Sequence, residues 1–452
     1  MNYKTIINLT EKIYLLLEKM GLNESIDIDT FLDNNYPRIS SAVQKYLDKE
    51  RIIFCSTNGK RTSANILNNI LEANNSDFIT NFTSDGKIHP ITTSVLFGNS
   101  KSEDEKSNIL NVVCNDNELI KNFNLMNFDY LVLGNIFSSQ TDFASVYEKK
   151  KKLQDAIILN SKLNLVINAD DPMLFEIDEI KDDIIIGKKR SKFFYGINDV
   201  ELYDNKEKLI QKTDIIKCPR CGCNLQYKKR FYSHLGDYYC ECGFRRPKPD
   251  MMANIKVFSD YSFMEVLYND KKMVFKLPLG GIYNAYNALC AIAVSMLLKI
   301  DRKTISEAFD NYKHLRGRDE IIEYKNKKIK IKIIKNPTSL SEAILEVHGS
   351  KNKKLLFVFD SEYTDGEDTS WIWDANLSCL ENYENRVYVT GKRFDDMALR
   401  LKYAGVNPSL ITMDNQIKYS NNSCYWALEK NEEMLIFTVP SSLNEVYKCL
   451  KN

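Results

Sequence analysis

Short apolar, β-rich runs alternate with helical stretches along most of this 452-residue chain. In the first half, strands are predicted at 51–55, 110–114, 129–134, 163–168 and 184–187. In the second half, strands are predicted at 354–360, 386–390, 410–413 and 434–439. Because strands and helices alternate in this way, we expect an α/β protein built on mostly parallel sheets with helices on both faces.

The alternation is interrupted at 213–250, where Cys, Gly, Tyr and basic residues are frequent and no helical period is visible. At roughly 100–200 residues per domain, a chain of this length holds two to four domains. We therefore expect a central domain over 1–311, interrupted by the insertion at 213–250. A second, Rossmann-like α/β domain is expected over 312–452.

The charge balance argues against a general nucleic-acid coat protein. Lys and Arg number 62 against 61 Asp and Glu, so no basic excess favours a nucleic-acid partner.

The longest apolar stretch, 289–300, is interrupted by Ser295 and Lys299 and is shorter than the ~20 residues of a membrane span. No charged-then-apolar leader begins the chain. We expect a cytoplasmic protein with no transmembrane segment.

A charged hairpin is predicted near 321–334, where Lys and Ile alternate up to Lys332. The alternation predicts a half-buried strand whose lysines face solvent. A nucleic-acid-binding patch is the alternative interpretation.

The strand at 51–55 runs into the sequence Ser-Thr-Asn-Gly-Lys-Arg-Thr and then into a helix. This is the arrangement of a phosphate-binding loop, in which backbone N–H groups and the helix N-terminus face the anion. Gly59 would permit close approach, and Lys60 would reach the terminal phosphates. The candidate residues of the loop are Thr57, Asn58, Gly59, Lys60, Arg61 and Thr62. The alternative is a surface turn that contains Gly-Lys by chance.

Five of the eleven cysteines lie between residues 218 and 242, in a C-x-x-C-G and a C-x-C-G segment. Two such knuckles can place four thiolates around Zn²⁺, as in a zinc ribbon. The expected ligands are Cys218, Cys221, Cys240 and Cys242. The second knuckle is one residue short, so Cys223 or His234 are candidate substitutes. A ribbon that folds on its tyrosines without metal is the alternative.

Several segments together carry a family resemblance. They are T-N-G-K at 57–60, N-A-D-D-P at 168–172, G-I-Y-N-A-Y-N at 281–287, G-R at 317–318, K-N-P at 335–337 and D-G-E-D-T-S-W-I-W-D at 365–374. The first four occur in the order seen in Mur ligases, which use ATP to build the cell-wall peptide through acyl phosphates. The last segment and the cysteine insertion resemble the MurT family, the Mur-ligase-like subunits of lipid II isoglutaminyl synthase.

The resemblance implies an amidating ligase of peptidoglycan biosynthesis. ATP would activate the α-carboxylate of D-glutamate in lipid II, and ammonia from a GatD-type glutamine amidotransferase would convert it to D-isoglutamine. The resemblance also implies further nucleotide contacts from Asn168, Asp170, Asn284, Asn287 and Arg318. The structural alternatives are a helix start for the two later asparagines and a strand-ending turn for the aspartate.

The acidic loop after the strand at 354–360 has its own implied role. MurT subunits supply an aspartate to the Cys-His pair of the partner glutaminase, and we assign this role to Asp368 first and Asp365 second. The chain has four histidines, none beside a cysteine in a nucleophile-like setting, so it is not expected to hydrolyse glutamine itself. The alternative is that these acids cap the following helix, with Trp371 and Trp373 in the core.

Three departures from the Mur ligase pattern concern the metal. The Thr that follows the loop lysine and holds Mg²⁺ is replaced by Arg61. A metal-binding Glu corresponds to Cys114. The stretch N-I-F-S-S-Q at 135–140 resembles the N-(I/F)-x-x-D-Q segment of Mur ligases, and the aspartate of that segment corresponds to Ser139. Either Arg61 contacts phosphate directly in place of the metal, or the nucleotide binds without turnover. The alternative function is therefore a catalytically decayed scaffold that binds and activates a glutamine amidotransferase.

Overall fold

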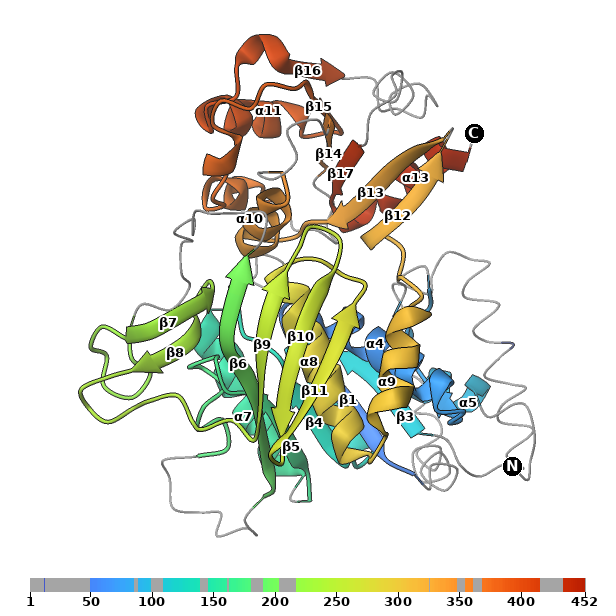
Figure 1. The fold of residues 1–452 in the computed structure, drawn as a ribbon, viewed down its shortest axis with the longest axis vertical. Coiled ribbons are helices and arrows are strands. Elements are labelled where there is room, and N and C mark those ends of the chain that lie inside the picture. Colours follow the sequence, from blue (N-terminus) through green and yellow to red (C-terminus); the bar gives the residue numbers. More distant parts are fainter. Residues whose placement is uncertain are drawn as a thin grey trace.

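The computed structural model describes residues 12, 49–84, 88–98, 109–138, 145–160, 162–179, 190–202, 217–324, 326–347, 354–360, 368–414 and 434–451. The predicted strand at 184–187 lies outside these residues. Two large sheets form the protein, one above the other in Figure 1. The predicted α/β fold with parallel sheets is confirmed.

The first sheet has nine strands in the order β11-β10-β9-β6-β5-β4-β1-β3-β2. Their bounds are β1 Arg51–Cys55, β2 Phe78–Ile79, β3 Ile109–Cys114, β4 Tyr130–Leu133, β5 Asn164–Asn168, β6 Lys192–Leu202, β9 Met251–Val257, β10 Ser262–Tyr268 and β11 Lys271–Leu277. The strands from β2 to β9 pair in parallel, and β10 and β11 add an antiparallel edge.

Helices cover both faces of this sheet because successive strand residues point to opposite sides. Ile52 and Phe54 of β1 pack in the core cluster of α4 (Lys60–Ala73), α8 (Ile282–Leu297) and α9 (Arg302–Asp310). Ile53 and Cys55 pack in the cluster on the other face. That cluster includes residues of α5 (Ile91–Gly98), α6 (Asp116–Leu125) and α7 (Val146–Leu159). The strand β1 is therefore buried on both faces.

The second sheet has six strands in the order β12-β13-β17-β14-β15-β16. Their bounds are β12 Arg318–Tyr324, β13 Lys327–Ile333, β14 Lys354–Val358, β15 Val387–Thr390, β16 Ile411–Asp414 and β17 Met434–Thr438. The α-helices of this part are α10 Pro337–Leu345, α11 Phe394–Tyr403 and α13 Leu443–Lys451. Short 3₁₀ helices are η1 Ser370–Trp373, η2 Ser378–Leu380, η3 Pro408–Leu410 and η4 Pro440–Ser442. Only the β12–β13 pair is antiparallel, so this sheet is also mostly parallel.

A two-stranded hairpin, β7 (Gln226–Tyr232) with β8 (Leu235–Tyr239), lies in the connection between β6 and β9. Parallel neighbours need a crossover connection, which is usually a helix. Here the hairpin and its flanking cysteines take that place, and they project beside β6 in Figure 1. Among the described helices, none combines the length and the apolar composition that crossing a membrane requires.

The expectation that the lysines of the charged hairpin face solvent is wrong for two of them. Lys330 and Lys332 in β13 are 6% and 3% exposed. Their ammonium groups are neutralised by Asp319 and Glu346, with Nζ–O distances of 2.5–3.8 Å. The Lys-Ile alternation predicted the strand correctly but could not reveal these acidic partners.

Candidate functional site

The loop between β1 and α4 depends on a glycine in the left-handed conformation. Gly59 precedes the first residue of α4, Lys60, and has a φ of +83°. A Cβ atom there would come within 1.9 Å of the Asn287 side-chain oxygen. Any side chain would therefore be strained by the backbone conformation and would force the Asn287 side chain to move.

The loop is also held against the end of β4. The Asn58 N–H donates to Oδ1 of Asn135 at 2.9 Å, and the Asn135 amide donates back to the Asn58 carbonyl at 3.0 Å. The Phe137 N–H donates to Oγ1 of Thr57 at 3.1 Å. Two strand ends thus fix the loop at the carboxyl edge of a parallel sheet, where α/β proteins place ligands.

A cavity lies between the two sheets and is lined by residues of both halves of the chain. The loop contributes Asn58, Gly59 and Thr62 to its wall. From α8 come Asn284 and Asn287, and from the second half of the chain come Arg318, Lys335 and Glu342, among others. The structure therefore brings together most of the residues predicted for nucleotide contact.

The second sheet is bonded directly to the loop. Nζ of Lys335 donates to the Thr57 carbonyl at 2.7 Å, and the Asn336 side chain donates to Oδ1 of Asn58 at 2.9 Å. The Asn336 side chain also caps α10 by accepting from the Ser339 N–H at 2.8 Å. The position of α10 is thereby tied to that of the loop.

Positive charge is concentrated around Lys335. Burial lowers the pKa of Lys335 well below its usual value, and the nearby charges of Lys60, Arg318 and Arg61 lower it further. Burial and the charge of Arg61 likewise lower the pKa of Arg318 to about 9. Mutual repulsion of this kind is relieved when an anion binds among the cations.

In the cavity wall and behind it, two lysines and two acids form a buried network, to which Asp319 and Lys332 belong as lining residues. Nζ of Lys332 is 2.5 Å from Asp319 and 2.6 Å from Glu346. Although burial lowers it, these two acids raise the pKa of Lys332 to about 12. Asn284 and Tyr283 donate to Asp319 at 3.0–3.1 Å, so α8 is joined to the second sheet.

One cavity residue that the sequence did not single out is Glu342 of α10. Its side chain is 4% exposed, and Oε1 has no hydrogen-bond partner among the described residues. Burial raises the pKa of this carboxyl to about 8, although the charge of Lys332 opposes the shift. No local pattern marks Glu342, because its burial comes from elements distant in the sequence.

Asn168 and Asp170 lie apart from the cavity wall. The Asn168 amide donates to the Gly134 carbonyl at 2.9 Å. Asp170 is fully buried and accepts from Arg246 at 2.5 Å, from the Tyr286 hydroxyl at 2.7 Å and from the Ile197 N–H at 2.8 Å. This geometry favours the structural alternative for Asp170.

Of the three positions that depart from the Mur ligase pattern, Arg61 and Cys114 lie within the described residues. Burial raises the pKa of the Cys114 thiol well above its usual value, and Cys114 is 1% exposed. The Lys60 ammonium donates to Oδ1 of Asn115, the residue that follows Cys114. Ser139 and Asp365 lie outside the described residues.

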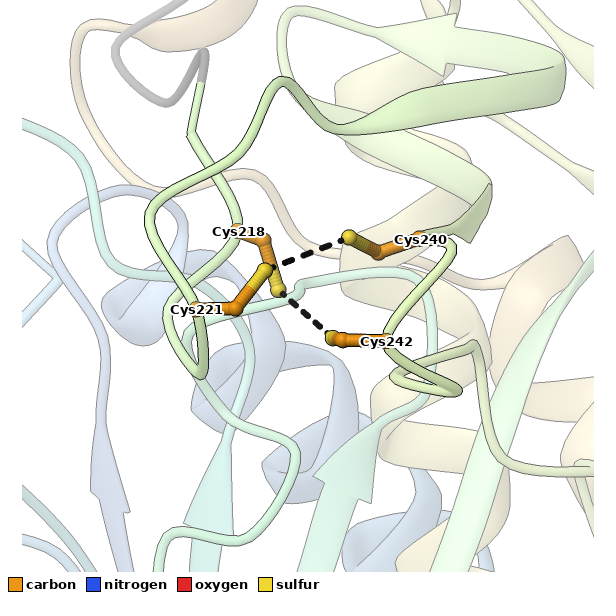
Figure 2. A group of neighbouring side chains, drawn as sticks. All are labelled: Cys218, Cys221, Cys240 and Cys242. Atoms are coloured by element: carbon orange, nitrogen blue, oxygen red, sulfur yellow. Dashed lines mark hydrogen bonds between the residues drawn. The ribbon is translucent and has the colours of Figure 1, made fainter.

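The four predicted cysteine ligands lie together (Figure 2). Their Sγ atoms are within 4.8 Å of one another, with 3.7 Å between Cys218 and Cys242 and 3.5 Å between Cys221 and Cys240. A zinc ion with tetrahedral Zn–S bonds of about 2.3 Å separates its sulfurs by about 3.8 Å. The donor set therefore fits Zn²⁺. Cys223 and His234 are not part of this group.

The two knuckles have matching backbone geometry. The Cys218 N–H donates to the Cys223 carbonyl at 2.7 Å, and the Cys240 N–H donates to the Phe244 carbonyl at 2.7 Å. Each knuckle contains a glycine with positive φ, Gly222 at 77° and Gly243 at 87°. The shorter C-x-C spacing therefore still forms the tight turn that a knuckle needs.

The tip of the hairpin reaches the cavity. Tyr232 and Leu235 line it, and the Gly236 N–H donates to the Asp170 carbonyl at 2.9 Å. Arg246, four residues beyond Cys242, forms the buried ion pair with Asp170. The cysteine insertion and the cavity wall are thus one connected structure.

Asp368 is exposed at the start of η1, where its carboxylate accepts from the Ser370 N–H at 2.8 Å and from its hydroxyl at 2.9 Å. These hydrogen bonds, the backbone one first, lower the pKa of Asp368. Trp371 is buried against Phe359, whereas Trp373 is 46% exposed. The carboxylate is accessible and is hydrogen-bonded to the first residue of η1, whose N-cap is Thr369.

Comparison with known families gives one match and several relatives. Residues 333–441 match the family model described as MurT ligase C-terminal. The MurT subunit of the glutamine-hydrolysing lipid II isoglutaminyl synthase of Staphylococcus aureus is 28% identical over 364 residues, covering 80% of this chain and 79% of that protein. The corresponding Streptococcus pneumoniae subunit is 26% identical over 430 residues, covering 92% and 91%.

Solved structures share the fold. A pseudomurein peptide ligase type C from Methanothermus fervidus superposes with a TM-score of 0.65 at 22% identity, covering 93% of this chain and 83% of that one. MurF from Acinetobacter baumannii gives 0.66 at 13% identity, covering 94% and 81%. The chain is therefore similar to MurT subunits, and its fold is that of the Mur ligases.

Proposed function

We propose that the chain is the ATP-binding subunit of a lipid II isoglutaminyl synthase. ATP bound in the cavity phosphorylates the α-carboxylate of D-glutamate in lipid II, and ammonia from a GatD-type glutaminase displaces phosphate to give D-isoglutamine. The reaction takes place at the cytoplasmic membrane face, where lipid II is accessible. The names of the bacterial relatives support this assignment.

The observation that carries the proposal is the cation-lined cavity between the two sheets. Gly59 and the start of α4 form an anion-binding loop, and Lys335 reaches that loop from the opposite side. Developing charge on the transferred phosphoryl group is stabilised by groups that are already in position. Because an acyl phosphate is readily hydrolysed, enclosure between two sheets also protects the intermediate from water.

The partner is proposed from Asp368. A carboxylate that accepts two hydrogen bonds from Ser370 is held in one orientation and stays ionised. Such a group can orient a histidine of another subunit and stabilise the imidazolium that forms during thiol attack on glutamine. Trp373, exposed nearby, would be covered by the same partner. Asp365 is the second candidate for this role.

The cysteine group is proposed to hold a structural Zn²⁺. Four thiolates leave no open coordination position, so the metal would not take part in catalysis. Its role would be to hold the two knuckles together and thereby the hairpin whose tip lines the cavity.

The test combines the purified chain, a GatD-type glutaminase, glutamine, ATP and lipid II, and measures amidated product by mass spectrometry. Lys60→Ala should reduce product formation by at least a hundredfold, because the loop loses its reach to phosphate. Lys313→Ala is the control, since that lysine is 74% exposed and pairs with Glu72 outside the cavity. Unchanged amidation in Lys60→Ala would disprove the ATP assignment.

The second candidate function is a scaffold that activates the glutaminase without turning over ATP. Arg61 and the buried Cys114 thiol favour it, because neither is a good Mg²⁺ ligand. In that case the chain would stimulate glutaminase activity, and the Lys60→Ala variant would stimulate it equally well. Amidated product from the wild-type complex would exclude the scaffold.

A further inference from the structure

Glu342 of α10 brings a buried carboxyl to the cavity between the two sheets. Its side chain is 4% exposed and lines the cavity, and among the described residues nothing donates a hydrogen bond to Oε1. An unsatisfied buried acceptor destabilises a fold, and native structures contain few of them. An acceptor of this kind in a cavity wall points to a ligand that donates a hydrogen bond.

Lys332 is the cation whose charge acts on Glu342, but its own donors are already used. The Lys332 ammonium donates to the Tyr283 hydroxyl at 2.7 Å, to Asp319 at 2.5 Å and to Glu346 at 2.6 Å. An ammonium group has three hydrogens to donate, so Lys332 has none left for Glu342.

The polar side chains that α8 presents at the cavity are bonded in the same way. The Asn284 amide donates to the Gly280 carbonyl at 2.8 Å and to Asp319 at 3.0 Å, which uses both of its hydrogens. The Tyr283 hydroxyl donates its hydrogen to the same carboxylate at 3.0 Å. These neighbours thus satisfy Asp319 and one another, and the donor for Glu342 has to come with the bound molecule.

The distance from the phosphate loop indicates which part of a nucleotide reaches Glu342. Asn336, the N-cap of α10, donates to Asn58 of the loop at 2.9 Å. Glu342 lies in the second turn of α10, about 9 Å further along the helix at about 1.5 Å per residue. Phosphates repel an ionised carboxylate and would stay at the loop beside Lys335. The ribose is the first uncharged part of a nucleotide beyond its phosphates, so it suits the position of Glu342.

We propose that Glu342 recognises the ribose of the bound nucleotide by accepting a hydrogen bond from its 2′- or 3′-hydroxyl. The inference rests on the proposed function for the existence of the nucleotide site and adds the residue that reads the sugar. An acidic side chain that accepts from a ribose hydroxyl is a recurring device of nucleotide-binding α/β folds. Because the buried oxygen is satisfied only when the nucleotide is bound, this hydrogen bond adds to the affinity.

The experiment measures the affinity of the full chain for ATP, 2′-deoxy-ATP and 3′-deoxy-ATP by titration calorimetry. ATP should bind about tenfold or more tightly than at least one of the two deoxy analogues. Equal affinity for all three would overturn the inference while leaving the nucleotide site in place. If none of the three bound, the nucleotide part of the proposed function would fail together with the inference.

Glu342→Met keeps the length of the side chain and removes both oxygens. In this variant ATP should bind as weakly as the disfavoured deoxy analogue, whose own affinity should be nearly unchanged. Glu342→Leu replaces it if the Met variant is unfolded by circular dichroism. The matched control is Glu323→Met, at an exposed position of β12, which should keep the wild-type preference.

Two results with the folded variant would contradict the assignment. A preference for ATP over the deoxy analogues that is as large as in wild type would show that the hydroxyls are read elsewhere. Inosine triphosphate, which lacks the amino group of adenine, tests the other neutral part of the nucleotide. If Glu342→Met abolished a preference for ATP over inosine triphosphate and left the ribose preference intact, Glu342 would read the base and the inference would be wrong.

Discussion

Replacing the unpartnered carboxyl of Glu342 by an amide should stabilise the protein in a strongly pH-dependent way. The folded-state pKa is raised from 4.5 to about 8, so the folded protein binds one more proton than the unfolded chain between these values. Stability therefore falls as pH rises through this window. At about 1.4 kcal/mol per pH unit, the wild-type penalty above pH 8 is at most about 5 kcal/mol. Glu342→Gln removes the ionisation and hence the penalty.

The assay is urea unfolding of wild type and Glu342→Gln at several values between pH 5 and pH 9. Fluorescence of the buried Trp371 reports on unfolding around Glu342. Trp371 packs in the same core cluster as Ile344 of α10, the helix that carries Glu342. The variant should be close to wild type at pH 5 and more stable by several kcal/mol at pH 9. Glu323→Gln, at an exposed position of β12, should show no such trend. If the difference in unfolding free energy between Glu342→Gln and wild type were the same at pH 5 and at pH 9, the reasoning would be refuted.

Three further predictions follow from other parts of the structure. Cys242→Ser should lower the zinc content below one ion per chain by elemental analysis and should lower the melting temperature, whereas Cys223→Ser should leave zinc content unchanged. Lys332→Met should destabilise the chain by about 3–5 kcal/mol in urea unfolding, because Asp319 loses its buried partner, and a loss below 1 kcal/mol would contradict the network. Asp368→Asn should reduce the activity of a copurified glutaminase by at least tenfold without changing ATP affinity, and equal glutaminase activity would rule out its role.

Local patterns were sufficient where burial and chain direction decide the structure. The strand Arg51–Cys55 was predicted with its observed bounds. An arginine followed by four apolar residues, before a turn that contains Gly-Lys, is typical of a buried strand in an α/β chain. The grouping of the four cysteines was also predicted, since spacing alone brings each pair together and the hairpin joins the pairs.

Contacts between residues distant in the sequence could not be predicted from local patterns. The burial of Lys332 depends on Glu346, fourteen residues later and on a different element. Glu342 looks like any polar residue of an amphipathic helix, yet in the fold it is 4% exposed. Asp170, assigned to the nucleotide by resemblance, is enclosed by Arg246 from beyond the second knuckle, a contact that no local pattern encodes.

The hairpin at the β6–β9 crossover gives the cavity a wall that is independent of either sheet. Tyr232 and Leu235 reach that wall from a segment that contributes no strand to the nine-stranded sheet. Such an appendage can change in length or sequence during evolution while the strand order stays the same. Related chains with the same sheets could therefore differ in the shape of this cavity, according to the segment inserted at this crossover.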